Sequence, residues 1–135
     1  MKVLKFGGTS VGSIDSILKV KQIVESQKEP VIVVVSALGG VTDQLIKVSN
    51  MAVAGGDDYL TLLGDLICRH ETMIKAVIPT SEAQNRIWKQ VKSLLDELAN
   101  ILRGVSLLQD LSQKTTDIIL SYGERISSII VAELV

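Results

Sequence analysis

The sequence predicts an α/β fold whose second half is helical. A short apolar run at residues 2–6 is followed by a glycine turn, a segment with helical periodicity and a second apolar run at residues 31–35. From residue 57 to residue 135, apolar residues recur at the three- and four-residue spacing of amphipathic helices. A chain of 135 residues has the length of one domain, so we treat it as a single unit.

Composition and charge argue against several classes of protein. Hydrophobic residues make up 47% of the chain and charged residues 21%, which is typical of globular rather than disordered proteins. The 14 basic and 15 acidic residues leave a net charge of −1, which argues against a nucleic-acid or membrane partner. One cysteine forms no internal disulfide and suits a reducing compartment, and the first residues predict a strand rather than a signal peptide. We therefore expect a cytoplasmic protein.

The first third of the chain predicts a strand, a helix and a second strand. Lys2–Phe6 is the first strand, and Ser13–Gln27 carries apolar residues at helical spacing. Val31–Val35 consists of five β-branched residues without polar alternation, which predicts a strand buried on both faces. A strand–helix–strand unit with a short helix makes the two strands parallel, so both should end at the same edge of the sheet.

The loop after the first strand has the chemistry of a phosphate site. Gly7 and Gly8 lack the Cβ atoms that would block close approach to an anion, and they allow positive φ. Lys5 adds an ammonium group at the strand end, and Thr9 and Ser10 add hydroxyl donors. The spacing matches neither G-x-x-x-x-G-K-[ST] nor G-x-G-x-x-G, so a tight turn between strand and helix is the alternative.

A second glycine loop follows the second strand, at Ser36–Thr42. Ligands of open α/β sheets bind beyond the carboxyl ends of the strands, where both loops should converge. Thr42 is also a suitable N-cap for a helix over Asp43–Ala54, so capping alone is the alternative role for this threonine.

Three longer helices are expected in the subregion from about residue 57 to residue 135. The first stops at Pro79, a capping box at Ser81–Gln84 opens the second, which ends near Gly104, and the third covers Thr116–Val135. The third helix carries an apolar stripe that we expect to need a partner outside the chain, which predicts a homo-oligomer. That stripe consists of Ile119, Tyr122, Ile126, Ile130 and Leu134.

The remaining chemically distinctive side chains predict packing rather than catalysis. We assign Cys68 and Trp88 to packing, and we interpret His70 as a partly buried histidine with satisfied hydrogen bonds, the alternative being a ligand. No second residue at suitable spacing completes a metal site with this histidine, and no Ser-His-Asp or Cys-His set is present.

A third motif, Ser121–Arg125, places Gly123 inside a helical pattern. Glycine costs about 1 kcal/mol relative to alanine in a helix, so close approach of a ligand or of another backbone is the usual reason for it. Glu124 could then face an ammonium group, the alternative being a solvated glutamate on the helix surface.

These three motifs, in this order, resemble those of aspartate kinases in the amino-acid kinase superfamily. K-F-G-G-T-S is similar to the opening of that family, V-V-V-S-A with the following threonine to its second motif, and S-Y-G-E to its S-x-G-E motif. The resemblance implies that residues 1–135 are the N-terminal, substrate-side part of a three-layer αβα catalytic domain. It implies phosphate and ATP binding, with a catalytic lysine, at Lys5, Gly7, Gly8, Thr9 and Ser10, and L-aspartate binding at Ser36, Thr42 and Glu124.

The resemblance also implies an activity. Such enzymes phosphorylate the side-chain carboxylate of L-aspartate with ATP, the first step of lysine, threonine and methionine biosynthesis, and Mg²⁺ is expected with the nucleotide although no ligand set for it is visible. The long helical stretch is similar to aspartate kinases fused to homoserine dehydrogenase and to lysine-sensitive single enzymes.

The resemblance covers less than half of such an enzyme, so we expect this chain alone to be inactive. Two alternatives remain. One is another member of the superfamily that acts on a different acid or on carbamate, and the other is a non-catalytic helical interaction domain.

Overall fold

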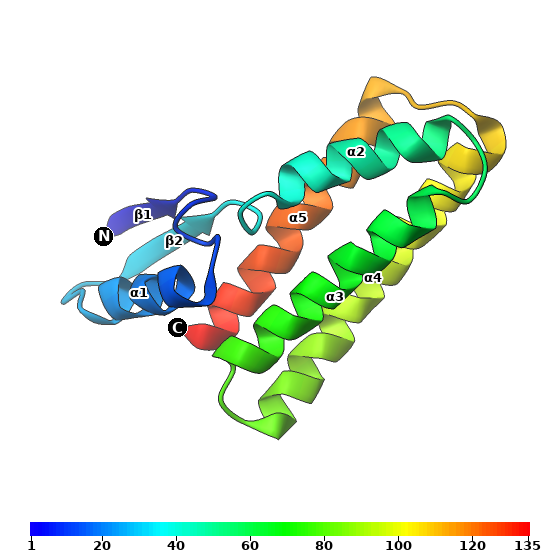
Figure 1. The fold of residues 1–135 in the computed structure, drawn as a ribbon. Helices are drawn as coiled ribbons and strands as arrows, with labels where there is room; N and C mark the ends of the chain where they lie inside the picture. Colours follow the sequence, from blue (N-terminus) through cyan, green and yellow to red (C-terminus); the bar gives the residue numbers. More distant parts are fainter.

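A computed structural model describes all 135 residues as two strands and five helices (Figure 1). The elements follow in the order β1 (Lys2–Phe6), α1 (Ile14–Glu25), β2 (Val31–Val35), α2 (Val41–Val53), α3 (Tyr59–Val77), α4 (Ser81–Leu108) and α5 (Gln113–Leu134). The α/β class and the helical second half are confirmed.

The two strands form a parallel sheet, as the strand–helix–strand pattern predicts. Their register pairs Lys2 with Val31 at one end and Phe6 with Val35 at the other. Beyond the last pair, the Ser36 amide donates to the Phe6 carbonyl at 3.0 Å. Both glycine loops therefore leave the sheet side by side at the same edge.

Only one face of β2 is covered, so the prediction of a strand buried on both faces is wrong for this chain. Val33 and Val35 pack against the core, whereas Ile32 and Val34 are 50% and 44% exposed. The helices α1 and α5 both contact the covered face, which Phe6 of β1 shares. β-Branched residues favour a strand wherever they lie, and their presence on both faces does not reveal how many layers cover it.

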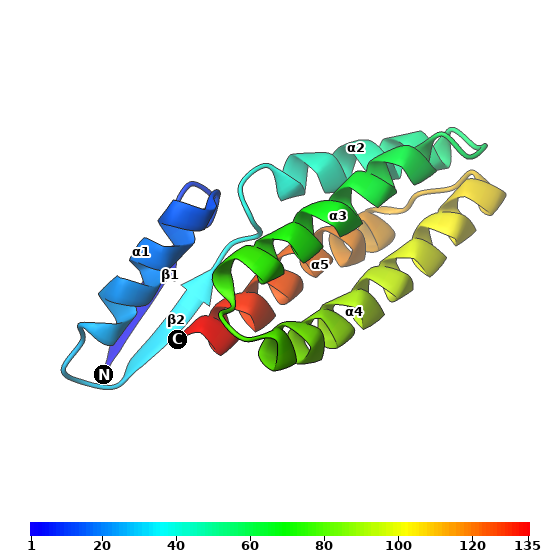
Figure 2. The same cartoon turned by 60° about the horizontal axis from the view of Figure 1, so that its bottom comes forward.

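The helices α2, α3, α4 and α5 form a bundle beside the sheet, and Figure 2 shows their long axes running roughly together. One core cluster of 29 buried residues joins this bundle to α1, to the strand ends and to the loop residues Val11 and Leu38. Burying a leucine or isoleucine side chain contributes roughly 1.5–3 kcal/mol. The sheet edge that carries both loops is therefore fixed against a packed interior.

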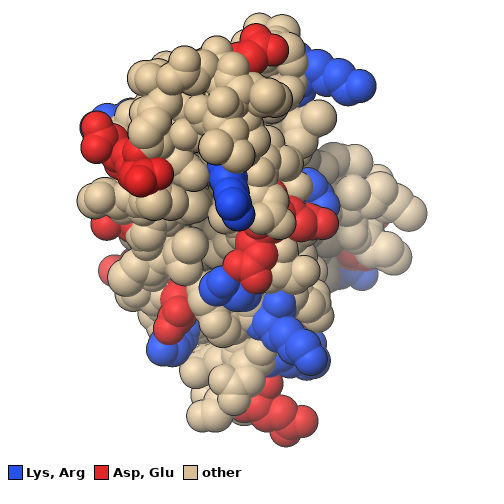
Figure 3. Space-filling view, turned by 90° about the vertical axis from the view of Figure 1, so that its right-hand side faces the viewer, with Lys and Arg blue, Asp and Glu red and all other residues tan.

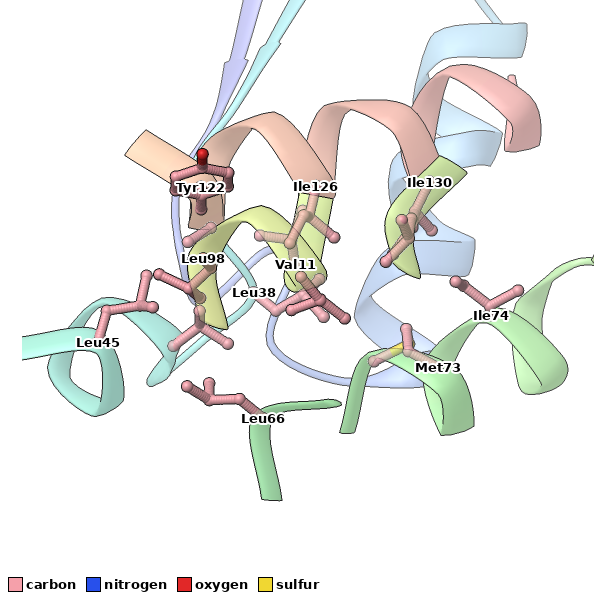
Figure 4. Packing of buried hydrophobic residues seen from close by; sticks show 14 of the residues in the cluster. Val11, Leu38, Leu45, Leu66, Met73, Ile74, Leu98, Tyr122, Ile126 and Ile130 are labelled. Atoms are coloured by element: carbon pink, nitrogen blue, oxygen red, sulfur yellow. The ribbon is translucent and has the colours of Figure 1, made fainter. Parts of the chain in front are cut away.

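The apolar stripe of α5 is covered by the chain itself, which contradicts the expectation that it needs an outside partner. Ile119 and Ile130 are 0% exposed, and Tyr122, Ile126 and Leu134 are buried as well. Figure 4 shows Ile126 and Ile130 of the stripe pointing into the same interior as residues from α2, α3 and α4. The helix α5 packs against both α2 and α4, and these helices cover its apolar stripe.

Two helix boundaries differ from the prediction. The helix α4 continues past Gly104 to Leu108, because Leu102 and Val105 on either side of the glycine are buried and outweigh its cost. It ends at Gln109, whose φ of 49° lies in the left-handed region. The helix α5 begins at Gln113, earlier than expected, because the Ser112 hydroxyl caps it by accepting from the Thr115 amide.

Two predicted caps are displaced. Thr80, and not Ser81, caps α4 by accepting from the Ala83 amide at 3.2 Å, and the Gln84 side chain donates instead to the Ile78 carbonyl. Thr42 is not the N-cap of α2. That position is Gly40, with a φ of 82°, and Thr42 lies in the first turn with an exposed side chain.

Trp88 and Cys68 differ in burial. Trp88 packs against the core, but Cys68 is exposed on α3, so the assignment of Cys68 to packing is wrong.

No helix combines the length and hydropathy needed to cross a bilayer. On the face drawn in Figure 3, acidic and basic side chains are interspersed rather than gathered into a patch of one sign.

Candidate functional site

The two glycine loops touch each other at the carboxyl edge of the sheet. A Cβ built on Gly39 would lie 2.8 Å from the Gly12 Cα and 2.9 Å from the Gly8 carbonyl oxygen. The Gly39 amide also donates to the Val11 carbonyl at 3.3 Å. The predicted convergence of the two loops is therefore confirmed, and it is a direct backbone contact.

The first loop presents three amides that donate no hydrogen bond within the chain. The Ser10 and Val11 amides both donate to the Gly7 carbonyl, at 3.1 and 3.3 Å, which closes the turn. The amides of Gly7, Gly8 and Thr9 make no such bond and are available to an anion. Neither glycine adopts positive φ, and a Cβ on Gly7 would meet nothing within 4 Å. Glycine here leaves space outside the turn rather than permitting its conformation.

Lys5 lies on β1 next to the end of the strand. It pairs with Val34 in the register, so it belongs to the uncovered face of the sheet, whereas Phe6 belongs to the covered face. Its side chain is exposed and takes part in none of the chain's salt bridges. The Lys5 ammonium is therefore an uncompensated positive charge beside the first loop.

Thr9 and Ser10 lie toward α1, on the side of the covered face of the sheet. Together with Phe6 and residues of α1, including Lys19, they line a cavity of about 290 Å³. The predicted phosphate-binding residues thus flank the loop on two sides: Lys5 on the uncovered face, Thr9 and Ser10 toward α1.

The second loop presents hydroxyl groups and a helix N-terminus. The hydroxyls of Ser36 and Thr42 form no hydrogen bond within the chain. Gly40 has no side chain with which to cap α2, and the first-turn amides of Thr42 and Asp43 donate no backbone bond. Such amides and hydroxyls can bind the carboxylate of a small ligand.

Gly123 of the third motif lies against the second loop. A Cβ on Gly123 would lie 2.8 Å from the Ala37 Cβ and 3.4 Å from the Val41 Cγ1, so α5 passes in contact with the second loop. Glu124 follows this contact directly, is exposed and has no salt-bridge partner. Its carboxylate is available to a cationic group of a ligand.

Two exposed charged residues, Arg125 and Glu97, lie at the buried Tyr122, two positions before Glu124. The Arg125 guanidinium lies over the Tyr122 ring, 4.7 Å from its centroid, and the Tyr122 hydroxyl lies 3.5 Å from a Glu97 carboxylate oxygen. A cavity of about 10 Å³ separates Tyr122 from His70.

His70 is more deeply buried than predicted, at 1% exposed, and only half satisfied. Its Nδ1 donates to the Leu66 carbonyl at 2.7 Å, while Nε2 has no partner. Burial lowers the pKa of His70, and the nearby Arg69 charge lowers it further, although the bond to Leu66 opposes both. The neutral ring packs in the core, and no set of side chains that could bind a metal ion lies around it.

Arg69 is a candidate residue that the sequence analysis does not identify. Its Nη1 lies 3.6 Å from the position that a Cβ would take on Gly40, so α3 places a cation beside the second loop. Arg69 forms no salt bridge, and its partial burial lowers its pKa. On the helical pattern alone this residue is one of several charged positions, and only the fold shows which loop it meets.

No group of three His, Cys, Asp or Glu side chains lies close enough together to hold a metal ion. The site therefore consists of a lysine, an arginine, free amides, hydroxyls and one carboxylate. Such groups can bind an anionic phosphate ester next to a small ligand that carries both a carboxylate and an ammonium.

Parallel strands with glycine loops that meet at their carboxyl edge, a lysine beside the first loop and a glutamate that follows the contact with the second are features of α/β proteins that bind small charged ligands. The sequence model of the amino acid kinase family matches residues 1–135, and the chain belongs to that family.

Relatives of known sequence include aspartokinase 1, chloroplastic, of Arabidopsis thaliana, 29% identical over 96% of this chain. Another is a bifunctional aspartokinase/homoserine dehydrogenase of Buchnera aphidicola, 31% identical over 99%. The chain spans 22% and 17% of the length of these two proteins.

The fold is similar to a solved structure of aspartokinase III from E. coli in complex with aspartate and ADP. The TM-score is 0.84 at 25% identity, over 99% of this chain and 28% of the other. The structure of E. coli aspartokinase III in complex with lysine and aspartate matches equally well. The family predicted from the three motifs is confirmed.

Proposed function

We propose that the protein carrying this chain is an aspartate kinase. It transfers the terminal phosphoryl group of ATP to the side-chain carboxylate of L-aspartate, which yields ADP and 4-phospho-L-aspartate. The observation that carries the proposal is the meeting of the two glycine loops at one sheet edge, with uncompensated groups of both charges around them. The relatives named above are aspartokinases, and one solved neighbour holds aspartate and ADP, which supports the choice of substrates.

The first loop would bind the phosphoryl group being transferred. The free amides of Gly7 and Gly8 donate to its oxygens, and the Lys5 ammonium neutralises the charge that is redistributed during transfer. Thr9 and Ser10 add hydroxyl donors to the nucleotide phosphates. Phosphoryl transfer needs positioning and charge neutralisation more than covalent help from the protein, and these groups supply both.

The second loop and α5 would hold L-aspartate. Ser36 and Thr42 donate their free hydroxyls to its carboxylates, and the Glu124 carboxylate accepts from its ammonium. In this arrangement the side-chain carboxylate of aspartate points across the loop contact toward the first loop.

A nucleotide-bound Mg²⁺ would lower the charge on the phosphates, but the residues of this chain do not make a site for it. No cluster of carboxylates or histidines lies near either loop. We therefore assign no step to the metal, and the roles above concern only the side chains and amides of this chain.

Two further properties belong to the same proposal. The protein acts in the cytoplasm, in keeping with its single exposed cysteine and near-neutral charge. It assembles into a homo-oligomer through a surface other than the α5 stripe, because that stripe is buried within the chain.

The test is a substrate panel. The full-length protein that carries this chain is incubated with ATP and, separately, L-aspartate, L-glutamate, N-acetyl-L-glutamate and carbamate, and ADP release is measured. We expect release with L-aspartate and formation of an acyl phosphate that hydroxylamine traps. Release with another acid alone would favour a different member of the family, and release with none would favour a non-catalytic domain.

A further inference from the structure

The contact between the two loops consists of backbone alone. Gly39 lies against Gly12 and Gly8, and the added Cβ of an alanine would come within 3.0 Å of two backbone atoms. Neither Gly39 nor Gly12 adopts positive φ, so their backbone conformations suit any residue. Glycine is therefore needed at this contact for its lack of a side chain and not for its flexibility.

Hydrogen bonds hold the same two segments together on either side of the contact. The Ser36 amide donates to the Phe6 carbonyl at 3.0 Å, and the Gly39 amide donates to the Val11 carbonyl at 3.3 Å. Between these bonds lie the groups assigned to the two substrates, the free amides of the first loop and the hydroxyl of Ser36. Any change in the spacing of the loops changes the distance between the two bound substrates.

We propose that Gly39 is a positioning residue that sets the distance between the phosphoryl group and its acceptor carboxylate by packing against Gly8 and Gly12. The inference rests on the proposed function, because it takes the first loop as the phosphate site and the second as the aspartate site. Each half-site keeps its own binding groups when the contact is altered. The contact therefore governs the reaction between bound substrates rather than the affinity for either one.

The variant Gly39→Ala tests this role. The new methyl group meets backbone, which no rotation of a side chain relieves, so the loops must move apart by several tenths of an ångström. A misplacement of about 1 Å costs on the order of 100-fold in rate, so we expect kcat to fall by at least about tenfold. The KM values for ATP and for L-aspartate, varied separately, should each stay within about twofold. A purely structural defect would not produce this separation.

The control is Gly64→Ala, because a Cβ at Gly64 meets nothing within 4 Å. Alanine also has a higher helix propensity than glycine, so this change should stabilise α3. The control variant should retain wild-type kcat. If Gly39→Ala fails to fold, as judged by circular dichroism, Gly12→Ala replaces it. Its Cβ would lie 3.0 Å from the Gly8 carbonyl oxygen, the atom against which Gly39 packs, and only in ordinary contact with the Gly39 Cα at 3.7 Å. It therefore acts on the loop contact through that oxygen, and a weaker form of the same kinetic pattern is expected.

The outcomes separate the two levels of the proposal. If the wild-type protein phosphorylates no aspartate, the proposed function fails and this inference fails with it. If the wild-type protein is active and Gly39→Ala keeps its kcat, only the inference is overturned. A rise in the KM for one substrate, with kcat unchanged, also overturns it, because Gly39 would then belong to one half-site.

Discussion

Gly123 on α5 lies directly against Ala37 in the second glycine loop. The Cβ that alanine would add at Gly123 comes within 2.8 Å of the Ala37 Cβ and 3.2 Å of the Leu45 Cδ1. The glycine inside the third motif thus has a packing reason. It lets α5 approach the second loop closely, and the next residue, Glu124, is exposed directly after this contact.

Three helical glycines give a matched prediction about stability. Gly123→Ala should destabilise the chain by about 1–3 kcal/mol, because overpacking of a close contact outweighs the gain in helix propensity. Gly64→Ala and Gly104→Ala should each stabilise it by up to about 1 kcal/mol, because a Cβ at either position meets nothing within 4 Å. Urea unfolding of the 135-residue chain measures all three. A Gly123→Ala variant as stable as the two controls would contradict the assigned contact.

Sequence patterns predicted the elements that hold the site, because strand and helix periodicity are local properties. Both strands, their parallel pairing and the two loops at their ends follow from the order of apolar runs and glycines. The caps were misplaced where two suitable residues stand side by side, as at Thr80 and Ser81, since tertiary contacts choose between neighbours. The uncovered face of β2 could not be predicted, because composition does not tell how many layers lie over a strand.

The candidate site was predictable as a set of residue types and not as a set of contacts. The first and third motifs indicate Lys5 and Glu124, whose charges have no partner within the chain. The contact of Gly39 with Gly12 joins residues far apart in sequence, and so does the approach of Arg69 to Gly40. No periodic pattern carries that information.

His70 predicts a dependence of stability on pH. Burial lowers its pKa in the folded chain below the ordinary value near 6.5, so the unfolded chain binds a proton that the folded chain does not. Stability is therefore full above about pH 6.5 and falls as the pH drops toward the folded-state pKa, by at most about 1.4 kcal/mol per pH unit. Urea unfolding between pH 7.5 and pH 5 measures the loss, and His70→Gln should remove this part of it.

The histidine is the only one in the chain, so its imidazole can be followed without ambiguity by NMR. A titration midpoint at or above 6.5 in the folded chain would contradict the prediction. The same spectra report whether Nδ1 carries the proton, as its bond to the Leu66 carbonyl requires.

The uncovered face of the sheet predicts association of the isolated chain. Val3, Ile32 and Val34 are 64%, 50% and 44% exposed and lie on one face of two paired strands. We expect light scattering to show a mass that rises with concentration, and the triple change of these residues to threonine should reduce it while keeping β-branched side chains. Leu107→Thr, at an exposed leucine on α4, is the control and should change nothing. A monomer at every concentration would count against this use of the face.

Loss of Lys5 and loss of Glu124 should impair the full-length enzyme in different ways. Lys5 faces charge that is redistributed during phosphoryl transfer, so Lys5→Ala should lower kcat, on the order of 100-fold or more. Glu124 faces the ammonium of aspartate, whose charge is constant through the reaction. Glu124→Ala should therefore raise the aspartate KM by roughly 10- to 100-fold, the cost of a lost charged hydrogen bond, with a smaller fall in kcat and little change in the ATP KM.

Steady-state kinetics with each substrate varied separately measures both variants. Lys28→Ala and Glu29→Ala, at the opposite end of the strands, are the charge-matched controls. Unaltered aspartate saturation in Glu124→Ala would return Glu124 to the role of a solvated residue on the surface of α5.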